Sequence, residues 1–124
     1  MPEIYIPDNL FGGSTMPIVT DAMIIAAGQN LKRGAVLGQI TATGKGKLVN
    51  SANAGATADG SETIYAILAE DVNATTVDKT VVVYLTGEFN ENALTFGGTD
   101  TSTMYKAAAR KVGIFFKSVV KGGQ

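Results

Sequence analysis

The fold is decided by residues Ile64–Phe96, which read IYAILAEDVNATTVDKTVVVYLTGEFNENALTF. Two apolar runs, Ile64–Ala69 and Val81–Leu85, are joined by a polar connection and followed by Gly87–Asn90. Runs of this length that are rich in Val, Ile and Tyr and bounded by Asn, Asp and Gly are typical of β-strands. We therefore predict that the two runs form paired strands in the core of the protein.

The second run is apolar on both of its faces. Side chains alternate along a strand, so Val81 and Val83 point to one side while Val82 and Tyr84 point to the other. Such a strand either lies inside a barrel or sandwich or has one face against another subunit. The sequence leaves both possibilities open, and the first is the more ordinary one for a small β domain.

The composition limits the possible functions. The chain has 124 residues, which suits one domain, and it contains neither cysteine nor histidine. Their absence removes disulfides, thiolate metal sites and every Ser-His-Asp or Cys-His arrangement. Ten basic and eleven acidic residues give a net charge of −1, which provides no electrostatic footprint for nucleic acid. We predict a protein that is not an enzyme and uses no cofactor or metal.

The sequence also argues against a membrane partner. The start of the chain lacks the basic and apolar segments of a signal peptide, and no apolar run approaches the ~20 residues that span a bilayer. We expect synthesis in a cytoplasm.

The first eighteen residues combine prolines with large apolar side chains. Pro2, Pro7 and Pro17 interrupt regular structure, because proline lacks a main-chain donor and restricts its predecessor. Disordered tails are normally poor in large apolar residues. The segment is therefore either an arm folded over its own domain or an arm that is ordered only on a partner. The large apolar residues include Ile4, Tyr5, Ile6, Leu10 and Phe11.

The rest of the chain predicts short strands and a single helix. Glycines punctuate the first half, with strands expected at Met23–Ala27 and Ala35–Ile40, a turn at Gly28–Asn30 and bends at Gly34 and Gly38. Asn50–Ser61 reads as a surface loop. Asp100–Lys111 predicts a helix with Met104, Ala108 and Val112 on one face and Gly113 after its end, before a strand at Ile114–Val120. The expected fold is mainly β with one short C-terminal helix (α+β), in a small β-clip or barrel-like domain.

Three short motifs suggest other functions. Gly44–Lys47 has the residue types of a phosphate-binding loop, but an apolar strand pattern follows it where that motif requires a helix. Leu31–Leu37 resembles a turn of lipoyl and biotinyl carrier domains and of β-clip domains, which leaves open a carrier or ligand-binding domain with Lys45 or Lys47 modified. The acidic residues near the strands could form a carboxylate pair, although solvated strand ends are the more ordinary explanation. These residues are Glu70, Asp71, Glu88 and Glu91.

Four segments taken in order resemble the lambda-type bacteriophage head decoration proteins. They are Tyr65–Val72, Val82–Tyr84, Thr86–Asn90 and Ala109–Phe115, and the turn at Gln29–Gly34 is similar as well. The resemblance covers about half of the chain. Another β-rich virion component, such as a tail protein, shares the composition and remains an alternative.

The resemblance implies a structural function on the virion. It implies a homotrimer on the exterior of an expanded capsid, where it stabilises the head by clamping neighbouring subunits of the major capsid protein. The expected organisation is a capsid-binding arm over residues 1–18, a β domain over 19–120 and a tail over 121–124. The candidate capsid-binding residues are Ile4, Tyr5, Ile6, Leu10 and Phe11.

Overall fold

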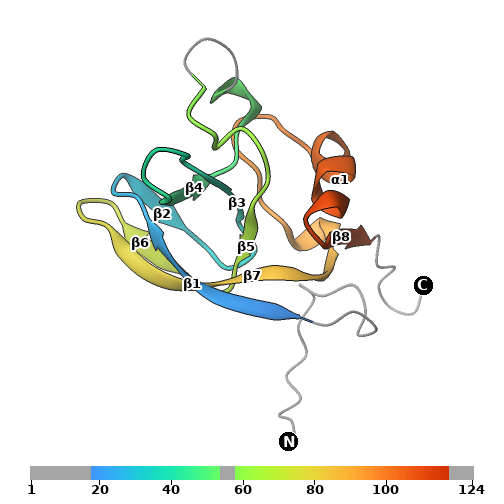
Figure 1. Cartoon of the computed structure of the whole chain (residues 1–124), viewed down its shortest axis with the longest axis horizontal. Coiled ribbons are helices and arrows are strands. Elements are labelled where there is room, and N and C mark those ends of the chain that lie inside the picture. Colours follow the sequence, from blue (N-terminus) through green and yellow to red (C-terminus); the bar gives the residue numbers. More distant parts are fainter. Residues whose placement is uncertain (1–17, 54–57, 118–124) are drawn as a thin grey trace, which may run out of the picture.

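The computed structural model describes residues 18–53 and 58–117 (Figure 1). Eight strands and one α-helix make up this part of the chain, together with two short 3-10 helices, η1 at Ser51–Asn53 and η2 at Glu91–Ala93. The strands and the α-helix are β1 (Val19–Ile25), β2 (Gln29–Leu31), β3 (Val36–Gln39), β4 (Gly46–Leu48), β5 (Ala66–Leu68), β6 (Val72–Ala74), β7 (Lys79–Asn90), α1 (Ser102–Lys111) and β8 (Ile114–Lys117).

Five strands close into a barrel. Their order is β1-β4-β3-β5-β7, and an additional antiparallel pairing between β1 and β7 joins the two ends of the sheet. The predicted pairing of the two apolar runs is confirmed, since Ile67 lies opposite Tyr84 and Leu68 opposite Val83. The expected fold class, a mainly β barrel-like domain with one helix near the C-terminus, is confirmed as well.

The central strands are apolar on both faces because each face packs against a different part of the same chain. Leu37, Leu68 and Val83 belong to a buried cluster formed by the barrel strands and the β2–β6 pair. Their neighbours Val36 and Ile67 belong to a second buried cluster. That cluster also contains the buried side chains of α1 and β8, namely Tyr105, Ala109, Ile114 and Phe116.

The second cluster therefore accounts for the apolar character of the outer side of the sheet. Tyr84 packs against it, so that side of β7 is covered by the protein itself at this position. Val82, two residues earlier on the same side, is 44% exposed. The apolar pattern of β7 thus reflects a barrel interior and a helix layer over most of its length, with Val82 left at the surface.

A two-stranded sheet extends one side of the barrel. β2 pairs with β6, placing Leu31 opposite Val72, and both of these side chains are buried in the barrel cluster. The predicted turn at Gly28–Asn30 is wrong in its second half, because Gln29 and Asn30 belong to β2 and the turn is confined to Ala27 and Gly28. The polar side chains at these positions suit an exposed strand whose apolar contact comes from Leu31.

Gly38 is not the bend that the sequence predicts. It lies inside β3 and is buried. A Cβ atom at this position would lie 2.3 Å from the main-chain oxygen of Ser61, so glycine is required for close approach rather than for a turn. Ser61, at the end of the predicted surface loop, is correspondingly buried.

The helix forms where the sequence predicts it, but a different face is buried. α1 spans Ser102–Lys111, and Gly113 follows its end with φ of +90°, a conformation that glycine adopts readily. Its buried residues are Tyr105 and Ala109, whereas Met104 and Val112 are 54% and 43% exposed. The face that the sequence marked with Met104, Ala108 and Val112 is therefore not the buried one. Among the described residues, no helix is both long and apolar enough to cross a membrane.

Aromatic contacts explain which face the helix buries. The Tyr105 ring stacks on Phe96 with 5.4 Å between centroids, and the Phe116 ring meets Phe96 edge-on at 6.0 Å. Met104 instead turns back toward the start of the helix, where its sulfur accepts a 3.4 Å hydrogen bond from the Thr101 N–H. β8 then pairs in parallel with the end of β7, and positions 118–120 of the predicted last strand lie outside the described residues.

Candidate docking surface

The predicted capsid-binding residues lie outside the part of the chain that the structure describes. These residues are Ile4, Tyr5, Ile6, Leu10 and Phe11. The description begins at Ile18, and β1 starts at the next residue. Ile18 and Val19 are each 46% exposed, so apolar side chains reach the surface where the N-terminal segment joins the barrel.

The outer face of the β1–β7 ladder continues this surface. Ala22 lies opposite Val82, and Ile24 lies opposite Thr80, all four on the side of the ladder that faces away from the barrel core. Ile24 is 43% exposed and Val82 is 44% exposed, while the intervening Met23 is buried. The exposed face is thus uncharged and partly apolar. Figure 1 shows β1 and β7 running side by side along one edge of the molecule.

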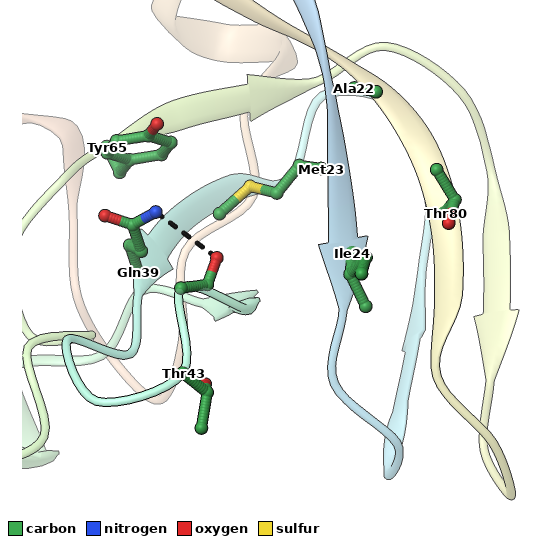
Figure 2. A pocket seen from close by; sticks show the side chains of 8 residues that line it. Ala22, Met23, Ile24, Gln39, Thr43, Tyr65 and Thr80 are labelled. Atoms are coloured by element: carbon green, nitrogen blue, oxygen red, sulfur yellow. Dashed lines mark hydrogen bonds between the residues drawn. The ribbon is translucent and has the colours of Figure 1, made fainter.

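An open groove lies between β1 and the opposite wall of the barrel (Figure 2). It has a volume of about 400 Å³. Figure 2 shows Met23 reaching from β1 toward Gln39 and Tyr65, and the Gln39 amide donates a 3.2 Å hydrogen bond to the Gly44 carbonyl. Every residue of the lining is uncharged: Ala22, Met23, Ile24, Gln39, Thr43, Gly44, Tyr65 and Thr80. The groove therefore suits an uncharged, partly apolar occupant.

Asp78 holds the turns at one end of the barrel together. Its carboxylate lies 2.6 Å from Lys45 Nζ and accepts a 2.8 Å hydrogen bond from the Ala27 N–H. The hydrogen bond from Lys45 and then that from Ala27 lower the pKa of Asp78 below its ordinary value. This contact could not be predicted from the sequence, because the three residues come from three separate connections between strands.

Asp59 organises a second polar cluster. It accepts a 2.5 Å hydrogen bond from the Ser61 hydroxyl and a 3.0 Å bond from the Ser61 N–H, and Lys47 Nζ lies 3.2 Å from its other oxygen. The Ser61 hydroxyl contributes most to lowering the pKa of Asp59, which falls to about 2. This cluster holds the segment after position 57 against β3, where Gly38 and Ser61 meet.

The lysine motifs are structural in this arrangement. Lys45 and Lys47 each form an ion pair, with Asp78 and Asp59 respectively. The segment after Gly44 continues into β4 rather than into the helix of a phosphate-binding loop. Neither lysine is presented alone at an exposed hairpin tip, as a carrier domain requires of its modified lysine.

The candidate carboxylates are held by different parts of the fold. Glu70 accepts a 2.9 Å hydrogen bond from the Val82 N–H, and Asp71 accepts a 2.8 Å bond from the Arg33 N–H. Glu91 accepts a bond from the Ser102 hydroxyl and lies 3.7 Å from Lys106 Nζ. Within residues 18–53 and 58–117, no group of three or more acidic residues is placed to hold a metal ion.

A comparison with protein families decides the relationship. Residues 3–114 match the model of the family described as bacteriophage lambda head decoration protein D. The chain belongs to this family. The match includes the N-terminal segment as well as the barrel and α1, and it confirms the resemblance inferred from the four sequence segments. A search of curated proteins found no match.

The name of the decoration-protein family places its members on phage heads, where they meet other proteins. The exposed β1–β7 surface is therefore considered as a candidate for contact with protein. The sequence pointed to the N-terminal segment but not to the groove or to the outer face of β1. The alternation of Ala22, Met23 and Ile24 could have signalled that face, had the strand been predicted to begin at Val19 rather than at Met23.

Proposed function

We propose that this protein is a non-enzymatic structural protein that binds as a trimer to the exterior of an expanded phage capsid. There it stabilises the head by bridging neighbouring subunits of the major capsid protein. The observation that carries the proposal is membership of the head decoration family, with a match over residues 3–114. The proposed location is the virion, after synthesis in the host cytoplasm.

The proposed division of labour follows the chain. Residues 1–18 form the capsid-binding arm, 19–120 form the rigid domain, and 121–124 form a tail. Contact with the capsid is assigned to the large apolar side chains of the arm: Ile4, Tyr5, Ile6, Leu10 and Phe11. The barrel supports this assignment because its two buried clusters make it a firm anchor. The exposed Ile18 and Val19 extend an apolar surface from the arm onto that anchor.

The mechanism is stabilisation by preferential binding. A ligand that binds only the expanded shell lowers the free energy of that state according to its concentration relative to its Kd. Three arms on one trimer bind in succession, and each bound arm raises the effective concentration of those that remain. This mechanism involves no chemical step.

Co-sedimentation with phage shells tests the proposal. The purified full-length chain should pellet with expanded shells of the phage that encodes it and stay in solution with unexpanded shells. Light scattering of the free chain should give a discrete trimer, since open rings or tubes would instead indicate a tail component. Equal binding to both shell states, or to neither, would overturn the proposal.

A further inference from the structure

β1 has a free edge over most of its length. On one side it pairs with β7 from Val19 to Ile25. On its other side it pairs with β4 only at Ile25, opposite Gly46, and the Ala26 N–H donates to the Gly46 carbonyl. The second hydrogen bond of this parallel bridge runs from the Gly46 N–H to the Ile24 carbonyl, so among the described residues no strand pairs with this side between Thr20 and Met23. A free edge of about 14 Å results, at ~3.4 Å per residue.

The hydrogen bonds of Val82 show which main-chain groups lie on the free edge. The Val82 N–H donates to Glu70, and its carbonyl accepts from the Ala69 N–H, so both groups point away from β1. Val82 and its partner Ala22 therefore form a pair that does not exchange hydrogen bonds, as happens at alternate positions of an antiparallel ladder. The main-chain groups of Ala22 point away from β7, and by the same alternation so do those of Thr20 and Ile24.

Asp21 covers part of this edge. Its Oδ1 accepts a 2.8 Å hydrogen bond from the Ala22 N–H. Charged side chains on an edge strand commonly hinder pairing with other chains. The groove of about 400 Å³ adjoins the same stretch, because Ala22, Met23 and Ile24 form one of its walls. The edge therefore opens into a space with an uncharged lining and is guarded by a single carboxylate.

We propose that an extended, uncharged segment of the phage shell protein adds to this edge as a strand, alongside Thr20–Met23. The inference rests on the proposed function. Connectivity selects the occupant, because the proposed capsid-binding arm ends where β1 begins, so an arm lying on the shell brings this edge to the shell. Main-chain pairing supplies affinity, and small or apolar side chains of the added strand face the groove at Met23 and Tyr65.

Two matched pairs of variants test the edge. Ala22→Pro removes the N–H on the free side and places the ring toward the groove, while the ladder with β7 keeps its hydrogen bonds. We expect its binding to expanded shells to weaken about tenfold, whereas Ala22→Ser binds like the wild type. Asp21→Ala uncovers the Ala22 N–H and should tighten binding roughly threefold. Asp21→Asn removes the charge but keeps an acceptor for the Ala22 N–H, so its binding should lie between those of the wild type and Asp21→Ala.

Hydrogen exchange provides a readout that does not depend on affinity. The amides of Thr20 and Ile24 should exchange quickly in the free protein and slow down on shells. Wild-type binding by both Ala22→Pro and Asp21→Ala would overturn the inference, as would slow exchange before any shell is added, which would indicate that a second copy covers the edge. If Ala22→Pro does not fold, the comparison of Asp21→Ala with Asp21→Asn tests the inference by itself. If the wild-type chain fails to bind shells, the proposed function fails and the inference falls with it.

Discussion

Ser51 and Asp100, 49 positions apart in the chain, are joined by two hydrogen bonds of 2.7 Å, from the Ser51 N–H and from the Ser51 hydroxyl. The Tyr105 hydroxyl donates to the same carboxylate. This carboxylate thus fastens the start of the loop after β4 to the first turns of α1. The hydrogen bond from Tyr105, followed by that from Ser51, lowers the pKa of Asp100, while burial raises that of Tyr105.

Replacing Asp100 should destabilise the helix layer. Asp100→Ala leaves the hydroxyl of Tyr105, a residue only 5% exposed, without its acceptor. Such a buried group costs about 1–3 kcal/mol of unfolding free energy. Tyr105→Phe removes the hydroxyl and keeps the ring on Phe96, so we expect a loss of about 1 kcal/mol. Urea denaturation should show that the double variant loses less unfolding free energy than the two single variants lose together. Strict additivity of the two losses would contradict the contact between Asp100 and Tyr105.

Gly38→Ala should be strongly destabilising. Its Cβ would lie 2.3 Å from the Ser61 oxygen, so β3 and the following loop must separate. We expect the free energy of unfolding to fall by about 3 kcal/mol or more, which is at the upper end of the range for overpacked sites. Gly28→Ala is the control, because nothing lies within 4 Å of its Cβ and only its φ of +100° is unfavourable. Thermal unfolding that ranks the control as the worse variant would refute the assigned role of Gly38.

The stability of the protein should fall in acid with a contribution from Asp59. Its pKa is about 2 in the folded chain against an ordinary value of 3.8, so the unfolded state binds a proton first as the pH falls. The stabilisation is therefore complete above about pH 4 and is lost as the pH falls toward 2. Asp78 and Asp100 act in the same direction. Urea titrations at pH values from 7 to 2 give the free energy of unfolding as a function of pH. Asp59→Asn should make this free energy fall less steeply between about pH 4 and pH 2 than it does in the wild type. An equally steep fall in both proteins would contradict the role of Asp59.

Much of the barrel could be predicted from local patterns. The runs at Ile64–Ala69 and Val81–Leu85 are β-branched and aliphatic, and they pair as expected. The closing contact between β1 and β7 could not be predicted, because it joins strands that are far apart in the chain and each has other possible partners. The same limit applies to β2 and β6, because a strand of only three residues is too short to show a recognisable alternation of apolar and polar side chains.

The helix shows why a periodic pattern did not determine the buried face. Met104, Ala108 and Val112 follow a helical spacing, but so do Tyr105 and Ala109. The choice between them depends on Phe96, whose ring stacks on Tyr105 and comes from a segment outside the helix. At the docking surface, the sequence indicated the apolar N-terminal residues, whereas the free edge of β1 depends on strand pairing and is visible only in three dimensions.

In the proposed function, the N-terminal arm binds the phage shell while the barrel anchors it. The most direct measurement is the binding of a chain lacking residues 2–17 to expanded shells, compared with the full-length chain by co-sedimentation. The truncated chain keeps every described strand and both buried clusters, so it should stay folded and trimeric. We predict that it no longer pellets with the shells. Undiminished binding by the folded, truncated chain would show that the arm does not carry the contact with the shell.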